Sequence, residues 1–244
     1  MSRRLFVNIG NTAVHWALEQ DGHWLADGRV GLGEASGAPA RLFMAVGEAP
    51  DAVIACVSNP QVLAVFAEAS PAPIQVLGRD FTGGIAVGYR DPGQLGADRL
   101  ASATGAARLF GVPCVVVSAG TCLTCEALSA EGALIGGAIA PGLPAYLQGL
   151  TAATPHLPAL ALDPSTILPE PGTTTQENLG VGVCLSLAGA ADRLAVAMRQ
   201  SVGESAALIL TGGDAGIVER FSLLQWQAAP LLDLEGLRII HDGV

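Results

Sequence analysis

The sequence repeats its opening segment about halfway along the chain, and this repeat limits the folds that the chain can adopt. The first copy runs from the apolar stretch FVNIG through Gly10 and an Asn-Thr pair to a second apolar stretch and the turn residue Gly22. The second copy, VVVSAGTCLTCEALSAEGALIGGAI, begins at Val115. Gly10 corresponds to Gly120 and Gly22 to Gly132, both with an offset of 110 residues. Because the apolar stretches recur in the same order as the glycines, duplication explains the pattern better than chance does.

The pattern of apolar stretches and turns predicts an α/β protein with two similar lobes. RLFVNIG, AVHWALE and HWLADGRV read as strands, and QDG is a hairpin turn between the last two. Helices are predicted at PARLFMAVGEA, PQVLAVFAEAS, ADRLASATGAARLFG, PGLPAYLQGLTAA and TQENLGVGVCLSLAGAADRLAVAMRQ, and shorter strands at AVIACV and ALIL. We expect one lobe over residues 1–112 and a second over residues 113–244. Two such lobes imply a cleft between them, which is a common place for a ligand.

Composition narrows the class of protein. Half of the residues are hydrophobic and 14% are charged, so the chain can bury a large core. The net charge is −10, and the twelve Lys and Arg residues are scattered, without the basic patch of a nucleic-acid-binding protein. No apolar run reaches the roughly 20 residues of a membrane helix, and the N-terminal segment lacks the apolar core and cleavage site of a signal peptide. We therefore expect a cytoplasmic protein with no nucleic-acid or membrane partner.

Five cysteines raise the question of metal or redox chemistry. Cys122 and Cys125 form a C-x-x-C pair within CLTC. A zinc site would need two further ligands, and no second pair or nearby histidine pair is present. An odd number of cysteines argues against a disulfide framework. Buried, unreactive cysteines are the better interpretation, with a zinc or redox role as the weakest of the alternatives.

Three glycine turns, NIGNT, SAGT and TGGD, follow one another along the chain. Glycine turns bring backbone amides close to a ligand, because no Cβ is in the way. In order and spacing these turns resemble the phosphate-1, phosphate-2 and adenosine motifs of the acetate and sugar kinase/Hsp70/actin superfamily. The resemblance implies two ribonuclease-H-like lobes, the actin-like ATPase duplication.

Further motifs resemble the type III pantothenate kinase family in particular. GYRDPGQLGADR at residues 88–99 is similar to that family's substrate segment, and GGAIAPGL, TPHLP, GTTTQENLGVG and LTGGD follow in the family's order. The resemblance implies a homodimer that transfers the γ-phosphate of ATP to the hydroxyl of pantothenate, the first committed step toward coenzyme A. It also implies Mg²⁺ and a monovalent cation, K⁺ or NH₄⁺, as cofactors.

The resemblance assigns roles to individual residues. Asp98 matches the catalytic base, a role that suits phosphoryl transfer, in which one residue accepts the hydroxyl proton. Arg99 matches a substrate-binding arginine, whose planar fork fits a carboxylate. The residues assigned to ATP binding are Asn8, Ile9, Gly10, Asn11, Thr12, Ala13, Val14, His15 and Thr121. Those assigned to pantothenate binding are Tyr89, Gly96, Ala97, Asp98, Arg99 and Thr175, the last reaching the substrate of the partner subunit.

Each of these residues also has a purely structural interpretation. Asp98 and Thr175 could be helix N-caps. Arg99 could be an exposed first-turn charge, Tyr89 a half-buried strand aromatic and Thr121 an ordinary strand threonine. Gly96 and Ala97 could form a plain tight turn, and His156, beside the substrate segment, is best read as a loop histidine.

Several positions depart from the family pattern at the phosphate and cation motifs. Asn8 replaces an aspartate of the first glycine turn, and His15 replaces a lysine found in several members. Ser118 stands where the family has the aspartate that holds the monovalent cation, and Glu126 replaces a further aspartate. Asn8 brings no negative charge to Mg²⁺, which prefers oxygen anions. Two hypotheses follow: a working kinase with an altered metal and cation site, or a catalytically impaired homologue that binds a ligand or acts as a regulator like a Bvg accessory factor.

Overall fold

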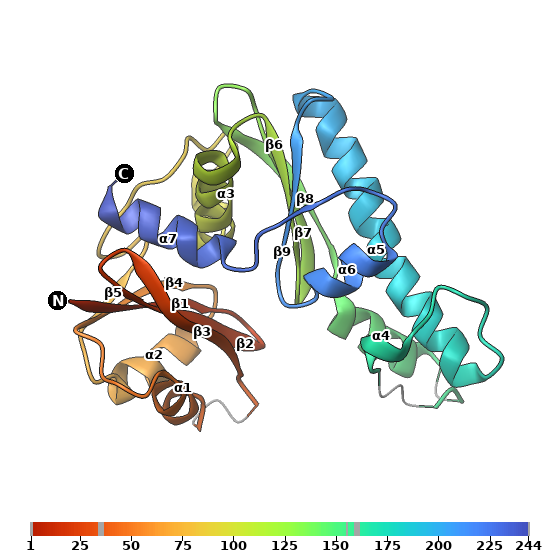
Figure 1. The fold of residues 1–244 in the computed structure, drawn as a ribbon, viewed down its shortest axis with the longest axis horizontal. Coiled ribbons are helices and arrows are strands. Elements are labelled where there is room, and N and C mark those ends of the chain that lie inside the picture. The colour runs from red at the N-terminus through yellow and green to blue at the C-terminus, as the bar shows by residue number, and fades with distance from the viewer. Residues whose placement is uncertain (1, 34–36, 155, 159–161, 244) are drawn as a thin grey trace. The chain divides into compact units, whose positions relative to one another are not determined.

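The computed structural model describes residues 2–33, 37–154, 156–158 and 162–243 (Figure 1). The chain divides into two compact units. The first comprises residues 1–109 together with residues 231–244, and the second comprises residues 110–230.

The first unit is built on a five-stranded mixed sheet. Its strands are β1 (Arg3–Ile9), β2 (Ala13–Gln20), β3 (His23–Gly31), β4 (Ala52–Val57) and β5 (Ile74–Val76), and its helices are α1 (Ala38–Val46), α2 (Pro60–Ala69), α3 (Ala97–Phe110) and α7 (Leu232–Asp242). The strand order is β3-β2-β1-β4-β5. β1, β2 and β3 pair antiparallel, whereas β1, β4 and β5 pair parallel.

Alternating side chains send the two faces of this sheet into different cores. Leu5 and Val7 of β1 pack with the side of the unit that holds α1 and α2. Phe6, between them, packs with Leu234 and Leu237 of α7 on the opposite face. Figure 1 shows α1 and α2 together on one side of the sheet and α7 on the other.

Helices α3 and α7 touch through their backbones. A Cβ atom on Gly236 of α7 would lie 1.7 Å from the carbonyl oxygen of Ala101 in α3, and one on Gly105 of α3 would lie 2.7 Å from the carbonyl oxygen of Leu232. Only glycine at both positions permits this approach, which fixes the start of α7 against α3.

The second unit repeats the architecture of the first. Its elements are β6 (Cys114–Ala119), β7 (Cys122–Leu128), β8 (Leu134–Pro141), α4 (Leu143–Ala153), α5 (Thr175–Val202), β9 (Ala207–Thr211), α6 (Ala215–Phe221) and β10 (Gln227–Ala228). The strand order β8-β7-β6-β9-β10 reproduces that of the first sheet, with the same antiparallel and parallel pairings. The hairpin glycines also match, since Gly22 has φ +83° and Gly132 has φ +82°. The two-lobed α/β fold expected from the repeat is therefore confirmed.

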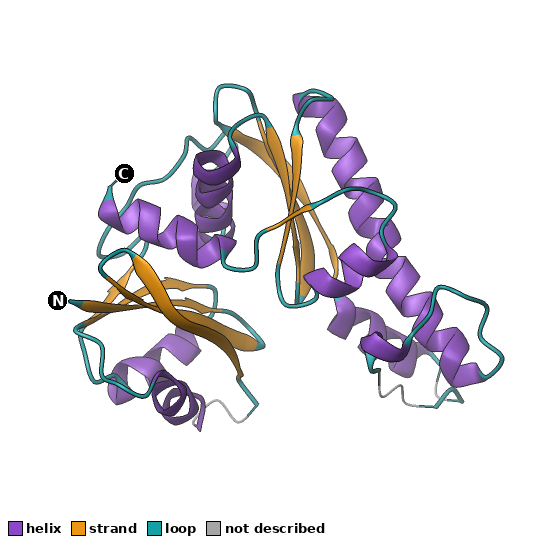
Figure 2. Cartoon of the chain, in the orientation of Figure 1, coloured by secondary structure: helices purple, strands orange, loops and turns teal. Residues whose placement is uncertain are grey.

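The long helix α5 is the main core helix of the second unit (Figure 2). Among the described helices, it alone has the length and the mean hydropathy, 1.5, of a membrane span. Its apolar face, however, packs against the sheet, with Leu187 and Ala191 beside Val115 and Val117 of β6. That packing is the behaviour of a core helix in a folded domain.

The structure assigns the C-terminal segment to a different unit from the one expected from the sequence. We expected residues 231–244 in the second lobe, whereas Leu232–Asp242 form α7 of the first unit. Leu234 and Leu237 account for this placement, because they fill the core beside Phe6 and Ile54. The main segment of the first unit ends at Leu109, and the expected boundary lay after residue 112.

Candidate active site

The first glycine turn joins β1 to β2. The amide of Gly10 donates to the carbonyl of Ala13 at 3.1 Å, and the carbonyl of Thr12 accepts from Leu32 at 2.8 Å. Asn11 and Thr12 are exposed, whereas Ile9 and Val14 are buried in the core beneath α1 and α2. Of this ATP-binding set, Ile9 and Val14 could therefore offer a ligand only their backbone groups.

Asn8 and His15 lie opposite each other on β1 and β2, beside this turn. Both are hydrogen-bonded to Asp233 in the first turn of α7. Asn8 Nδ2 donates to Asp233 Oδ2 at 2.7 Å, and His15 Nδ1 lies 2.9 Å from Asp233 Oδ1. Burial alone would raise the pKa of Asp233, but the hydrogen bond and charge of His15, the hydrogen bond of Asn8 and the charge of Arg29 hold it below its ordinary value. The ionised carboxylate of Asp233 therefore contacts Asn8 and His15 beside the first glycine turn.

Sequence reasoning missed Asp233. It is separated from His15 by 218 residues and from Asn8 by 225. No local pattern marks it, because an acidic residue in the first turn of a helix is common. Only the return of α7 to the first unit brings it to the glycine turn.

Asp98 lies in the first turn of α3. The helix begins at Ala97, so Asp98 is not the N-cap residue that its structural interpretation required. Its carboxylate folds back over Gly96, where a Cβ atom would lie 2.6 Å from Asp98 Oδ1. Burial, followed by the charges of Asp233 and Asp98, raises the pKa of Cys56. Cys56 is the neighbour of Asn8 on β4, so both carboxylates are close to the strand that leads into the glycine turn.

Tyr89 and Arg99 form a pair at the start of α3. Arg99 Nη2 donates to the hydroxyl of Tyr89 at 2.6 Å, and the guanidinium carbon lies 5.7 Å from the centre of the tyrosine ring. Tyr89 lies in an irregular segment rather than in a strand, and both side chains are half-buried. The structure therefore pairs two residues of the pantothenate-binding set, and Asp98 is the chain neighbour of one of them.

The second glycine turn joins β6 to β7 in the second unit. Thr121 lies in this turn and not within a strand. Two other glycines pack on the turn and the end of β6: a Cβ on Gly142 would be 2.0 Å from the carbonyl oxygen of Gly120, and one on Gly212 would be 2.1 Å from that of Ala119. The GGAIAPGL and LTGGD motifs thus meet the SAGT turn through backbone contacts.

Ser118 lies beside two other hydroxyl side chains. Its neighbours across the sheet are Thr124 on β7 and Thr211 on β9. Glu126, further along β7, is buried. Within the described ranges, no group of three or more His, Cys, Asp and Glu side chains could hold a metal ion.

Thr175 begins α5 and is exposed. Its structural interpretation, that it caps the helix, is wrong by one residue. Thr174 is the N-cap: its hydroxyl accepts from the amide of Glu177 at 3.2 Å, and the Glu177 carboxylate accepts from the amide of Thr174 at 3.1 Å. The Thr-x-x-Glu spacing of a capping box could have identified this residue in the sequence.

The two cysteines of CLTC lie in different environments, and the carbonyl of Cys122 accepts from the amide of Gly120 in the second glycine turn at 3.0 Å. Cys122 is exposed at the start of β7, whereas Cys125 is buried in the core, where burial raises the pKa of its thiol to about 12. His156 is exposed in a loop.

Comparison with known proteins identifies the family. The model of the type III pantothenate kinase family matches residues 4–197. Among curated relatives, a type III pantothenate kinase of Akkermansia muciniphila is 34% identical over 78% of this chain and 77% of its own length. One from Dehalococcoides mccartyi is 30% identical over 99% and 98%, and one from Azoarcus sp. is 32% identical over 97% and 89%.

Solved structures agree on the fold. A protein of Campylobacter jejuni described as a Baf family transcriptional activator has a TM-score of 0.62 at 18% identity, over 98% of both chains. The activator of 2-hydroxyisocaproyl-CoA dehydratase from Clostridium difficile, with bound ADPNP, has a TM-score of 0.59 at 14% identity over 98% and 95%. The fold and the extent of the family match lead to one conclusion: the chain belongs to the type III pantothenate kinase family.

Proposed function

We propose that the chain is an ATP-dependent pantothenate kinase, which transfers the γ-phosphate of ATP to the hydroxyl of pantothenate. The observation that carries the proposal is the grouping of Asp98, Arg99 and Tyr89 at the start of α3. This grouping supplies a candidate proton acceptor and a carboxylate-binding fork side by side. Membership of the family supplies the identity of the substrates.

Tyr89 and two residues of the first turn of α3 would each have a separate role toward pantothenate. Arg99 binds the substrate carboxylate, and Tyr89 orients the guanidinium through its hydroxyl. Asp98 accepts the proton of the substrate hydroxyl as the hydroxyl attacks the γ-phosphate. Among the described residues, the Asp98 carboxylate has no hydrogen bond or ion pair of its own, so it is available for this task.

The glycine turns would hold the nucleotide. The amides of Gly10 and Gly120 donate within their own turns, to the carbonyls of Ala13 and Cys122, so the other backbone amides of the two turns would bind phosphate oxygens, without any charged side chain. Asn8 Oδ1 is a buried acceptor without a partner among the described residues, and it suits the water shell of a phosphate-bound Mg²⁺. Such an ion would neutralise charge that develops on the phosphates during transfer. That Thr121 and Thr175 of the second unit join the residues of the first unit in one active site stays a prediction.

A strong monovalent-cation site does not fit the residues at Ser118. The side chains beside it, Thr124 and Thr211, carry hydroxyls and no charge. Hydroxyl oxygens alone bind K⁺ or NH₄⁺ more weakly than a carboxylate would. We infer that catalysis by this chain depends little on K⁺.

We further propose a cytoplasmic homodimer. Two isoleucines on the edge strand β8 support an assembly, because Ile135 is 44% exposed and Ile139 is 62% exposed. Exposed apolar side chains on an edge strand commonly mark a protein–protein contact. Thr175 is exposed, as expected for a residue that reaches a partner's substrate.

The experiment is a product assay on the native chain and on Asp98→Asn. Formation of 4′-phosphopantothenate is followed by ³¹P NMR with MgATP and pantothenate. We expect product from the native chain and a loss of about 10²–10⁴-fold in kcat for Asp98→Asn, the usual contribution of a general base. Near-native turnover in a folded Asp98→Asn protein rejects this role. Pantothenate binding with no turnover in the native chain would favour the impaired, regulatory homologue.

A further inference from the structure

A row of polar side chains crosses three strands on the α7 face of the first sheet. Asn8 on β1 is the cross-strand partner of His15 on β2, and His15 is the partner of Arg29 on β3. Cross-strand partners project to the same side of a sheet. The row stands beside the point where β1 ends and the first glycine turn begins.

Asp233 of α7 forms hydrogen bonds with two residues of this row, Asn8 and His15. Asp233 is buried, with 8% of the residue exposed, and its carboxylate accepts from Asn8 Nδ2 at 2.7 Å. His15 Nδ1 lies 2.9 Å and 3.0 Å from the two carboxylate oxygens. Because an ionised carboxylate only accepts hydrogen bonds, it requires the NH₂ group of Asn8 and a proton on Nδ1 of His15. One carboxylate therefore sets the orientation of both residues.

The orientation of Asn8 leaves an acceptor for a ligand. With Nδ2 turned to Asp233, Oδ1 points the other way, and it is buried with no partner among the described residues. Buried acceptors are rarely left unpaired, since that costs free energy. Phosphate oxygens cannot satisfy Oδ1, because they are acceptors too. A water molecule on a phosphate-bound metal ion can, because metal-bound water is a donor.

We propose that Asp233 is a positioning residue of the nucleotide site, which holds Asn8 and His15 for MgATP and supplies from α7 the negative charge that position 8 lacks. This inference rests on the proposed kinase function and deepens it. Asp233 acts through the two side chains that it orients. It thereby couples the last helix of the chain to the first glycine turn.

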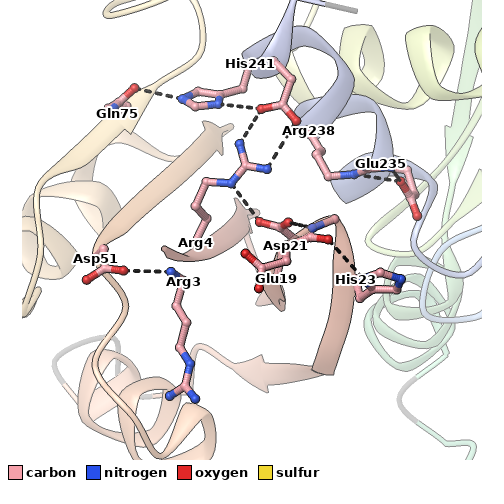
Figure 3. A network of polar contacts seen from close by, with 12 residues as sticks. Arg3, Arg4, Glu19, Asp21, His23, Asp51, Gln75, Glu235, Arg238 and His241 are labelled. Atoms are coloured by element: carbon pink, nitrogen blue, oxygen red, sulfur yellow. Dashed lines mark hydrogen bonds and ion pairs between the residues drawn. The ribbon is translucent and has the colours of Figure 1, made fainter. Parts of the chain in front are cut away.

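Helix α7 is also attached to the sheet by contacts that do not involve Asp233. Arg4 of β1 forms an ion pair with Asp242 at the other end of the helix, and His241 Nε2 lies 3.0 Å from Gln75 Oε1 (Figure 3). Leu234 and Leu237 bury the apolar face. A buried charge adds little to folding stability, because the cost of its desolvation offsets much of its attraction to its partners. A role in the site explains Asp233 better than a role in anchoring.

The test compares Asp233→Asn with Asp242→Asn, a matched change in the same helix that weakens an anchoring contact away from the row. The ¹⁵N NMR shifts of His15 report its Nδ1 proton without nucleotide, and calorimetry measures MgATP affinity. For Asp233→Asn we expect altered His15 shifts and about 10-fold or greater loss of MgATP affinity, the usual effect of removing a charged hydrogen-bond partner. For Asp242→Asn we expect native shifts and affinity.

A third variant tests whether a loss of MgATP affinity in Asp233→Asn comes from misfolding. Asn8→Asp combined with Asp233→Asn exchanges the carboxylate and the amide, so MgATP affinity should return to within about threefold of native, because the charge and the hydrogen bond are both retained. Native affinity in Asp233→Asn, or no rescue in the exchanged protein, overturns the positioning role while leaving the kinase function standing. Failure of the native chain to bind MgATP overturns the proposed function and this inference with it.

Discussion

Replacing Gly236 by alanine tests the backbone contact that holds α7 against α3. The added Cβ would lie 1.7 Å from the carbonyl oxygen of Ala101 and 2.9 Å from the amide nitrogen of Gly105. A carbon atom and a carbonyl oxygen approach to about 3.3 Å, so the helices must separate by roughly 1.5 Å. Backbone atoms cannot swing aside as the end of a flexible side chain can.

The expected loss follows from two opposing terms. Alanine in place of glycine inside a helix gains about 1 kcal/mol. Overpacking of this severity costs about 3 kcal/mol, the upper end of the usual range. The net loss of about 2 kcal/mol should lower Tm by about 4–8 °C, at 2–4 °C per kcal/mol for a chain of this size.

Thermal unfolding followed by circular dichroism measures the effect, with Gly149→Ala as the matched control. Gly149 lies inside α4, and a Cβ there would have no atom within 4 Å, so alanine should raise Tm slightly. If Gly236→Ala raises Tm as the control does, the contact between α3 and α7 is not as close as described.

Three further outcomes can be checked. Because its neighbours hold the pKa of Asp233 below the ordinary value, its contribution to stability is complete above about pH 4 and is lost as pH falls toward the folded pKa. Urea unfolding at pH 7 and pH 3 should therefore show a steeper acid loss for the native chain than for Asp233→Asn. Thr174→Ala should cost about 1 kcal/mol in urea unfolding, and Thr175→Ala less than about 0.5 kcal/mol, because only Thr174 caps α5. Arg99→Lys should raise KM for pantothenate about 10-fold with a smaller change in kcat, because lysine keeps the charge but loses the fork; an unchanged KM would argue against Arg99 as the carboxylate ligand.

The duplicated fold could be predicted because its signals are local. Gly22 and Gly132 adopt the same positive φ in hairpins, so the backbone itself requires the residues that reveal the repeat. Apolar runs such as AVIACV and VVVSA mark buried strands in both units. The strand order then follows from the repeat, since each unit has to bury the same two faces.

The site was only partly predictable, because part of it depends on distant segments. The Tyr89–Arg99 pair lies within one motif, and its residues were expected together. Asp233 was missed because hydrophobic burial of Leu234 and Leu237 decides where α7 lies, and no short-range pattern records that choice. Gly236 was likewise unremarkable in the sequence, since a helical glycine shows its purpose only when its neighbour is known.

Turnover of the native chain with MgATP and pantothenate, in the presence and absence of K⁺, tests the central claim most directly. That claim is an active pantothenate kinase whose altered glycine turns have lost a strong cation site. We expect 4′-phosphopantothenate at similar rates with and without K⁺, and K⁺ activation only after Asn8→Asp and Ser118→Asp are introduced together, because the second change restores a carboxylate beside Thr124 and Thr211. Strong K⁺ activation of the native chain, or no product under either condition, would contradict the account.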